Sequence, residues 1–346
     1  MEYVNDINII EAVINVLDNN GEEAILNEYK LDLSDEIYKF LYKHIEKAFK
    51  DEELKYAIFN PDRHIVKDVS QEFLTGVNTD IIEVSKEFSK QMFYIMRANK
   101  NIPSCDLITV YISTDHGPML GILKLDYVKN FTHKVDFVDE KIGIGIIEQA
   151  TGLPASSQKL QKCAFIKPIR ENQAVDLMVI DKQKKGKDGE DYGANYFINH
   201  YLGCTVIQNE RDMTKSFMKA AEVFTRNNII EDAAKAIEVR DTIKTRMKVE
   251  DTVNVNEIAR EVFKDDFDMQ ENFNSFMEAQ GVERDIEVDK DWVEKKLKKV
   301  RLNIDREIDL HLSSEAYHDS DKFEIIKNGD GTINIVIKRI KSFIEK

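Results

Sequence analysis

The first hundred residues mix the two-residue spacing of strands with the spacing of amphipathic helices. The β-branched run INIIEAVINVL (7–17) precedes the turn-forming DNNGEE and predicts a strand, with EAILNEY as a candidate hairpin partner. LSDEIYKFLYKHIEKAF has apolar residues at helical spacing and predicts a helix that begins at a Ser34 N-cap. TDIIEVSKEFSKQMFYIMRANK predicts a long helix with Thr79 as its cap.

The spacing becomes that of strands over residues 104–181. CDLITVYISTDHGPMLGILKLDY predicts two strands around a DHGP turn. KNFTHKVDFV, KCAFIKPI and AVDLMVID continue as short β-rich segments, so the pattern favours an antiparallel meander. With the preceding helices covering one face of this sheet, residues 1–205 are expected to form an α+β domain.

Residues 206–283 have helical spacing throughout and predict a helical domain. NVNEIAREVF opens with Asn254 and has Glu257 three residues later, which is typical of a capping box. DMQENFNSFMEAQG repeats this form with Asp268 and Glu271 and ends at Gly281, a candidate residue for a helix C-terminus. Two apolar stripes precede these helices, one of Met213, Phe217, Ala220, Ala221 and Phe224, the other of Ala236, Val239, Ile243 and Met247.

Residues 284–346 predict a small α+β unit. A basic helix, WVEKKLKKV, is followed by KFEIIKNGDGTINIVIKRI, a hairpin around Asn-Gly-Asp-Gly. Val293, Leu297 and Val300 would form the inward side of the helix. The expected fold class is therefore α+β, with an N-terminal antiparallel β-meander and helices, then a helical region, then a small C-terminal β-hairpin unit.

Charge and composition restrict the classes of function. The 346 residues carry a net charge of −15, and a field of this sign repels nucleic acid and anionic membranes at long range. Three scattered cysteines argue against a disulfide framework or a zinc ribbon and fit a reducing compartment. The N-terminus lacks the features of a signal peptide, and no apolar run reaches the ~18 residues of a membrane span. We therefore expect a cytoplasmic protein that does not enter membranes.

The charges are segregated along the chain. Between Lys159 and Lys187 eight basic and three acidic residues give a net charge of +5, whereas residues 264–294 hold eleven acidic and three basic residues and have a net charge of −8. These basic regions are candidate phosphate contacts, and the alternative is a solvated loop and a helix whose lysines only face water. The candidate DNA-binding residues are Lys182, Lys184, Lys185 and Lys187 in VIDKQKKGKDGEDYG, and Lys295, Lys296, Lys298 and Lys299 in the basic helix.

No motif predicts a catalytic, metal or cofactor site. His200 and Cys204 stand four residues apart, but two ligands do not make a zinc site and no second pair is near. We interpret them as part of a helix end at which Gly203 permits the turn. GIGIIEQATG lacks the order of a phosphate-binding loop, and PASSQKL is too weak a match to a serine-hydrolase elbow.

Two further patterns bear on nucleic-acid chemistry and recognition. A Mg²⁺-dependent nuclease would gather carboxylates and a lysine, and the available carboxylates are Asp126, Asp136, Glu148, Asp176 and Asp181. Residues 255–282 have the loose form of a helix-turn-helix, but the second helix has acidic residues and no Lys or Arg. Phosphates would repel it, so it is not a recognition helix.

An ordered series of blocks identifies a family resemblance. DLMVIDKQ, ANYFINHYLGC, MTKSFMKAAEVF, NEIAREVF and NFNSFMEAQG follow one another, with YAIFNPD, FSKQMFYIM and LITVYIS…MLGILKLDY before them and KFEIIKNGDGTINIVIK after them. In order and spacing the chain resembles the bacterial 37-kDa nucleoid-associated protein family (NdpA/YejK-like) over nearly its whole length. The resemblance implies a nucleoid-associated protein that binds DNA without known catalysis, and it supplies no catalytic residues.

Three hypotheses follow. The first is a non-catalytic protein that contacts the DNA backbone without sequence preference, needs no cofactor, and has a nucleoid or topoisomerase-type protein as a possible partner. The second is a protein-interaction module, possibly in phage defence, whose acidic 264–294 segment mimics DNA or binds a basic partner. The third is a Mg²⁺-dependent nuclease. A two-fold homodimer is the default expectation for assembly.

Overall fold

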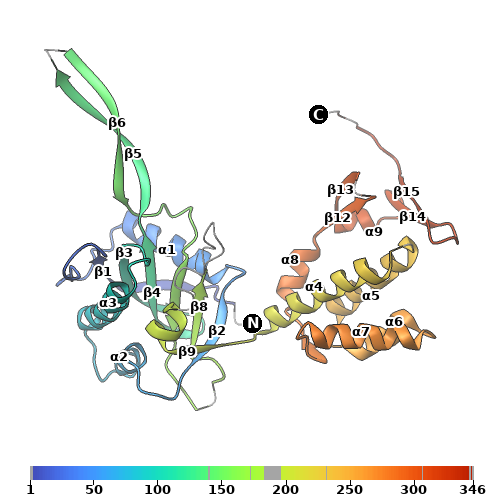
Figure 1. The fold of residues 1–346 in the computed structure, drawn as a ribbon, viewed down its shortest axis with the longest axis horizontal. Helices are drawn as coiled ribbons and strands as arrows, with labels where there is room; N and C mark the ends of the chain where they lie inside the picture. The colour runs from blue at the N-terminus through green and yellow to red at the C-terminus, as the bar shows by residue number, and fades with distance from the viewer. Residues whose placement is uncertain are drawn as a thin grey trace. The chain divides into compact units, whose positions relative to one another are not determined.

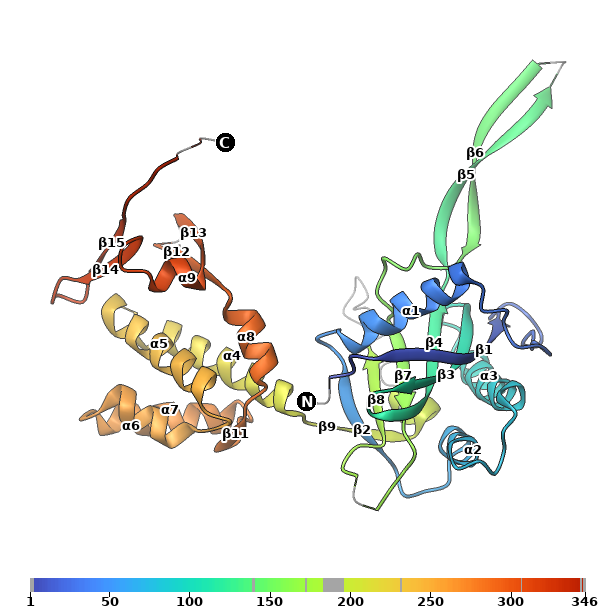
Figure 2. The same ribbon diagram turned by 180° about the vertical axis from the view of Figure 1, so that it is seen from behind.

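The chain folds into two compact units, residues 2–207 and residues 208–346 (Figures 1 and 2). The structure is a computed structural model and describes residues 3–138, 141–171, 173–182, 196–230, 232–305, 307–342 and 344. Contacts group residues 208–346 together, so the boundary expected between residues 283 and 284 stays a prediction.

An antiparallel sheet forms the centre of the N-terminal unit. Its strand order is β1-β3-β4-β7-β8-β2-β9. Four of these strands, β3, β4, β7 and β8, are successive neighbours, which confirms the predicted meander. β1 pairs along its length with β3 and makes only the single bridge Val16–Ile25 with the expected hairpin partner. The bounds are β1(Ile7–Leu17), β2(Lys55–Phe59), β3(Cys105–Thr114), β4(Gly117–Asp126), β7(Lys162–Ile166), β8(Leu177–Asp181) and β9(Cys204–Ile207).

Helices cover both faces of this sheet, not the single face expected from the sequence. α2(Ile65–Leu74), α3(Ile81–Ala98) and the π-helical segment η1(Tyr196–Leu202) share one apolar core with alternate residues of the strands. α1(Asp35–Phe49) packs on the other face, where Phe49 stacks on Phe165 with 4.1 Å between ring centroids. Because Phe165 lies between Ala164 and Ile166, which belong to the first core, β7 is buried on both sides.

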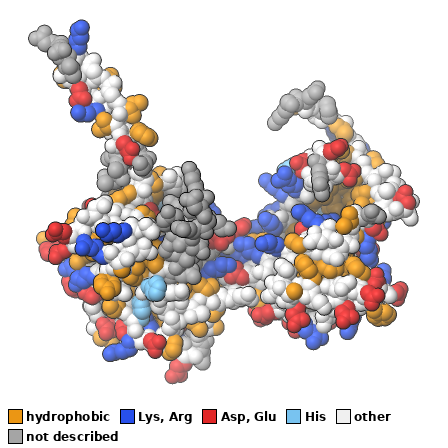
Figure 3. All heavy atoms as spheres, viewed as in Figure 1, with side chains coloured by type: hydrophobic (Ala, Val, Ile, Leu, Met, Phe, Trp, Pro, Cys, Tyr) orange, Lys and Arg blue, Asp and Glu red, His pale blue; other side chains and the backbone are white. Residues whose placement is uncertain are grey.

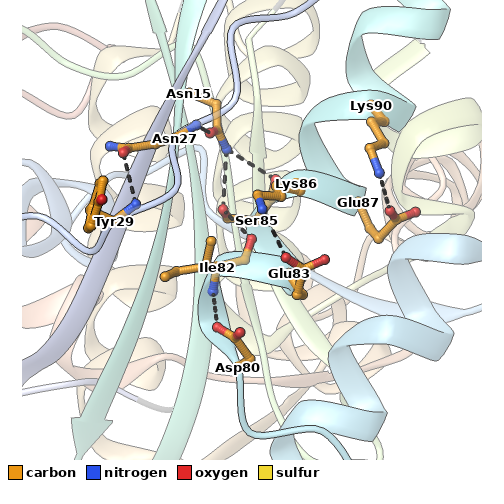
Figure 4. A network of polar contacts seen from close by, with 10 residues as sticks. All are labelled: Asn15, Asn27, Tyr29, Asp80, Ile82, Glu83, Ser85, Lys86, Glu87 and Lys90. Carbon is orange, nitrogen blue, oxygen red and sulfur yellow. Dashed lines mark hydrogen bonds and ion pairs between the residues drawn. The ribbon is translucent and has the colours of Figure 1, made fainter.

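A buried asparagine fixes α3 on β1 (Figure 4). Asn15 Nδ2 donates to the Ser85 carbonyl at 3.2 Å and to Ser89 Oγ at 2.8 Å, and Asn15 Oδ1 accepts from the Asn27 backbone at 2.7 Å. The side chains of Asn15, Ser85 and Ser89 are all buried, so the hydrogen bonds satisfy polar groups that water does not reach. The helix begins one residue later than expected: Asp80, not Thr79, caps it by accepting from the Ile82 backbone at 2.9 Å.

The segment expected to continue the meander instead leaves the sheet. β5(Val128–Val138) and β6(Lys141–Gly152) pair only with each other and project from the body as a two-stranded arm (Figures 1 and 2). The chain then returns to the sheet as β7, beside β4. The sequence has the alternation of strands here, but alternation does not show which strand is the partner.

Helices form the core of the C-terminal unit. Phe224, Phe263 and Phe273 meet at its centre, with centroids of the Phe224 and Phe273 rings 5.0 Å apart. Asn254 caps α6 as predicted, whereas Asp266, not Asp268, caps α7. Gly281 follows α7 with a φ of 72°, the left-handed conformation expected there. The helices are α4(Glu210–Asn228), α5(Ala233–Val249), α6(Val255–Phe263), α7(Phe267–Ala279) and α8(Lys290–Leu297), and β10(Thr252–Asn254) pairs with β11(Asp285–Glu287).

Two hairpins complete the C-terminal unit. The predicted one is β14(Phe323–Lys327) with β15(Ile333–Ile337). The other, β12(Lys299–Ile304) with β13(Ile308–Ser313), replaces the end of the expected basic helix, because α8 ends at Leu297 and Val300 lies in a strand. A short helix, α9(Ser314–His318), joins the two hairpins.

Candidate nucleic-acid interface

The basic residues predicted between positions 182 and 187 do not form a described surface. Lys184, Lys185 and Lys187 lie outside the described residues. Lys182 is already engaged, because its Nζ lies 2.7 Å from Oδ2 of the buried Asp51, which also pairs with Lys159 at 3.1 Å. Burial would raise the pKa of Asp51, but hydrogen bonds from Lys182, the Glu53 backbone and Lys159 outweigh it and lower that pKa. Lys182 therefore has a structural role.

The C-terminal lysines do form a surface. Asp289 caps α8 by accepting from the Trp292 backbone at 3.0 Å, and the buried Trp292 and Val293 anchor the helix in the core. With that side fixed inward, the basic residues of the helix end and of the outward side of β12 are exposed. We call this set the basic patch: Lys295, Lys296, Lys298, Lys299 and Arg301.

Contacts within the basic patch leave its charge directed outward. Lys296 Nζ lies 5.9 Å from the centre of the Trp292 ring, a cation–π contact at the base of the patch. Lys299 and Arg301 alternate with the half-buried Val300, so both lie on the exposed face of the strand. Arg301 also lies 3.5 Å from Asp309 on β13, and such exposed pairs are weak. Figure 3 shows Lys and Arg side chains gathered over this part of the unit.

Acidic residues gather on a different part of the same unit. α7 contains no Lys or Arg, and exposed carboxylates extend from the turn before it to its end (Figure 3). We call this set the acidic ridge: Asp265, Asp266, Asp268, Glu271 and Glu278. Such a surface repels phosphates, so the absence of a recognition helix in the α6–α7 pair stays a prediction from charge.

A groove of about 1190 Å³ lies between α4, α5 and the C-terminal hairpins. Ile237, Leu302 and Ile325 contribute to its apolar lining. Two of its arginines, Arg226 and Arg240, pair with Glu222 at 2.6 Å and 2.8 Å. Arg301 of the basic patch also lines the groove, so the groove and the patch meet at this residue.

The structure brings together two buried lysines and their carboxylate partners, which sequence reasoning did not identify as a group. Lys124 on β4 pairs with Asp126, and Lys162 on β7 pairs with Asp181 on β8. Lys124 and Lys162 are directly opposite each other in neighbouring strands. One signal was present in the sequence: Lys124 lies within the apolar run of its strand, between Leu123 and Leu125. A lysine at such a position needs a partner, because burying an unpaired charge is costly.

The surroundings of these four charges are apolar and aromatic. Lys162 Nζ lies 4.8 Å from the centre of the Tyr196 ring. Burial raises the pKa of the Tyr196 hydroxyl and raises that of the Cys105 thiol to about 12. The thiol therefore stays protonated at neutral pH and is a poor nucleophile. Each carboxylate is neutralised by a lysine, an arrangement that fixes the register of β4, β7 and β8.

The carboxylates considered for a nuclease do not come together. Asp136 and Glu148 lie on the arm, and Asp176 accepts from the Phe59 backbone at 2.9 Å in the loop before β8. Within the described part of the chain, no three His, Cys, Asp or Glu side chains are placed to hold a metal ion. Asp126 and Asp181 are each paired with a lysine.

His200 and Cys204 do not share a helix face. His200 ends up on the exposed side of η1, and its carbonyl lies 3.1 Å from His64 Nε2. The chain then turns at Gly203, and Cys204 begins β9 as a buried residue. Burial raises the pKa of the Cys204 thiol to about 12. This confirms the interpretation of the stretch as packing around a glycine turn, at the end of the N-terminal unit.

No helix in the described residues is both long and apolar enough to cross a bilayer.

Comparisons with known proteins agree with the blocks seen in the sequence. A search among curated proteins gave no match. A family model described as nucleoid-associated protein YejK matches residues 13–344, which includes both units, the arm and the basic patch. The chain therefore belongs to the YejK family of nucleoid-associated proteins.

Proposed function

We propose that this protein acts at the bacterial nucleoid, in the cytoplasm, as a non-catalytic protein that binds the DNA backbone through the basic patch. The observation that supports this most strongly is the patch itself. It places five exposed cations at the end of a helix and on the following strand, and the buried Trp292 anchors that helix in the core. Membership of a family of nucleoid-associated proteins supports the same proposal. The lysine ammonium group is a point charge on a flexible stem and lacks the planar fork of arginine. It therefore suits contact with phosphates better than recognition of base edges, and we expect little sequence preference.

The net charge of −15 does not exclude this binding mode. At physiological ionic strength charges are screened over about 8 Å, so a phosphate at the basic patch interacts mainly with the residues nearest to it. The total charge lowers the rate of encounter, and the local charge determines contact. We therefore expect binding that is weak at physiological salt and strongly dependent on salt concentration.

The test is an anisotropy titration of the full chain against a generic duplex. If four lysines contact phosphates, affinity falls roughly 100-fold between about 50 and 200 mM salt. A variant with Lys295, Lys296, Lys298 and Lys299 changed to Gln should lose most of the binding and most of the salt dependence. Equal binding by this variant and the unaltered chain would contradict the proposal.

A matched control separates the basic patch from total charge. Lys39, Lys43, Lys50 and Lys90 are exposed on α1, α3 and the turn after α1, and changing them to Gln removes the same amount of positive charge. This control should keep its affinity within a few fold. A second variant with Lys184, Lys185 and Lys187 changed to Gln tests the other predicted contact. Lys182 is left unchanged in this variant, because its removal would take one lysine partner away from the buried Asp51 carboxylate and destabilise the fold.

A protein partner is the second candidate, and the acidic ridge supports it. Five carboxylates on one helix and its preceding turn present the charge that a basic protein surface would meet. A nucleoid or topoisomerase-type protein is the class of partner we would test. The assay is a pull-down after nuclease treatment, with the unaltered chain compared to a variant that carries Glu271→Lys and Glu278→Lys. Loss of the partner only in this variant would support the acidic ridge as its binding surface.

Because the proposed protein binds DNA without catalysing a reaction on it, DNA incubated with the protein should remain intact. The assay uses Mg²⁺ and Mn²⁺ in separate reactions over long incubation. Cleavage that disappears in an Asp126→Asn, Asp181→Asn variant would contradict the proposal and assign the buried carboxylates to a nuclease.

A further inference from the structure

The arm formed by β5 and β6 has one apolar face that is open to water. Strand register places cross-strand partners on the same side of a two-stranded ribbon. Val135 is opposite Ile144, and Phe137 is opposite Ile142. The same side continues toward the body with His133 opposite Ile146 and Phe131 opposite Glu148. The exposed fraction is 72% for Ile144, 75% for Phe137 and 80% for Ile146.

The opposite side of the arm has a different character. Lys134 is opposite Gly145, and Asp136 is opposite Gly143. A Cβ added at Gly145 would have no heavy atom within 4 Å, so nothing in the described structure packs there. Most of the large apolar side chains of the arm therefore lie on a single side, which is the pattern of a strand pair with one face buried against another sheet.

The N-terminal unit itself does not cover this face. Both views of the fold show the arm projecting away from the sheet (Figures 1 and 2). An isolated two-stranded ribbon is only marginally stable in water, and further strands or packing against another element are needed for independent stability. An apolar face of this length thus requires a partner surface.

The charge of the arm argues against DNA as this partner. Residues 128–152 contain three lysines and four carboxylates, so the arm has a net charge of −1. The described side chains of its apolar face include no Lys or Arg. A surface that neutralises phosphates needs Lys or Arg, and those residues are concentrated in the basic patch of the other unit instead.

The exposed area is suited to a second copy of the same face. Two phenylalanines and four aliphatic side chains, exposed to the extent seen here, present roughly 500 Å² of apolar surface. Two such faces together would remove about 1,000 Å² from water, which is the lower limit for a specific interface. A two-fold axis near Val135 and Ile144 would stack each arm on its counterpart, because an isologous interface uses the same patch twice.

We propose that the apolar face of the β5–β6 arm is a self-association surface that binds the arm of a second copy of this chain. The inference rests on the arm alone and does not depend on DNA binding by the basic patch. Ribbon against ribbon gives a four-stranded, two-layer packing in which the apolar side chains of both copies are buried.

The test is the mass of the full chain in solution, measured by sedimentation over about 1–100 µM. We expect a dimer that dissociates on dilution. Ile144→Glu should give a monomer, because a two-fold axis would bring two like charges together in an apolar layer. The matched control is Thr132→Glu, which adds the same charge to the opposite side of the same arm and should leave the dimer intact.

Cross-linking gives an independent readout of the same contact. All three native cysteines are buried, so a thiol cross-linker reaches an introduced exposed cysteine first. Ile144→Cys should be linked into covalent dimers by a short bismaleimide, and Thr132→Cys should not. Circular dichroism of each variant shows that the fold is retained.

Three outcomes would overturn the inference. One is a monomer over the whole concentration range. Another is an Ile144→Glu chain that stays dimeric. The third is a monomeric chain that loses affinity for a generic duplex when Ile144 is changed, because the arm would then be a nucleic-acid contact.

Discussion

At the residue scale, buried polar groups show where the fold depends on a single partner. His44 on α1 is almost fully buried, and its Nε2 donates to the Pro154 carbonyl at 3.3 Å. Its Nδ1 has no partner among the described residues. Burial is the main cause that lowers the pKa of His44, and the charge of the nearby Lys47 lowers it further. The hydrogen bond to the Pro154 carbonyl raises this pKa but does not outweigh the other two effects.

This lowered pKa gives a prediction for the pH dependence of stability. Below about pH 6.5 an unfolded chain takes up a proton at this histidine, while the folded N-terminal unit does not. Stability from neutral His44 is therefore complete above that pH and is lost as the pH falls toward the lower, folded-state pKa. Urea unfolding followed by circular dichroism at about pH 7.5 and 5.5 measures it.

The comparison that isolates His44 uses His44→Gln, whose amide keeps a donor for the Pro154 carbonyl. This variant should lose less stability between the two pH values than the unaltered chain. His116→Gln serves as control, since His116 is exposed in the turn between β3 and β4. Identical pH profiles for all three chains would show that His44 does not titrate differently on folding.

At the scale of elements, one glycine connects η1 to β9. Gly203 has a φ of 63°, and a Cβ built there would lie 2.5 Å from His64 Cδ2. Nε2 of the same ring donates to the His200 carbonyl at 3.1 Å, so the ring is held in place. The turn thus needs both the left-handed conformation and the missing side chain.

Gly203→Ala should therefore destabilise the N-terminal unit. The left-handed conformation costs about 1–2 kcal/mol for a residue with a Cβ, and the contact with His64 adds to it. A second variant, Gly203→Ala with His64→Ala, removes the close contact and should recover part of the loss. Gly76→Ala is the control for backbone conformation alone, because Gly76 also has a positive φ but has open space around it. Chemical unfolding by circular dichroism compares the four chains.

At the scale of the whole molecule, two separate cores make the units distinguishable in one experiment. The only tryptophan, Trp292, is buried in the core of residues 208–346. Its fluorescence reports on that unit, while circular dichroism reports on both. Asp289 connects the core to the basic patch: it caps α8 and contacts Arg211 Nε at 3.4 Å, with both side chains buried.

Asp289→Ala should lower the unfolding free energy seen by Trp292 fluorescence by about 3–5 kcal/mol, because it removes one partner of a buried ion pair. The part of the circular dichroism transition that belongs to residues 2–207 should not move. Asp291→Ala, an exposed neighbour on the same helix, is the control and should stay within about 0.5 kcal/mol. Equal shifts by both probes would show that the two units unfold together.

The sequence by itself determined most of the local structure, because local structure follows from neighbours in the chain. Apolar spacing predicted the strands 7–17, 105–114 and 117–126 and the helices of the C-terminal core. Helix starts were less certain, since Thr79 and Asp80, or Asp266 and Asp268, offer similar capping oxygens only one or two residues apart. The family was also readable, because ordered blocks persist in the sequence.

Only the tertiary structure decided which elements meet. Strand alternation cannot specify a partner, so the departure of β5 and β6 as an arm and the position of β2 between β8 and β9 were not predicted. The same holds for charge: Lys182, which the sequence predicts as a DNA contact, pairs in the fold with Asp51, 131 residues away. Burial and pairing depend on residues distant in the chain, and these contacts separate a structural lysine from one that faces water.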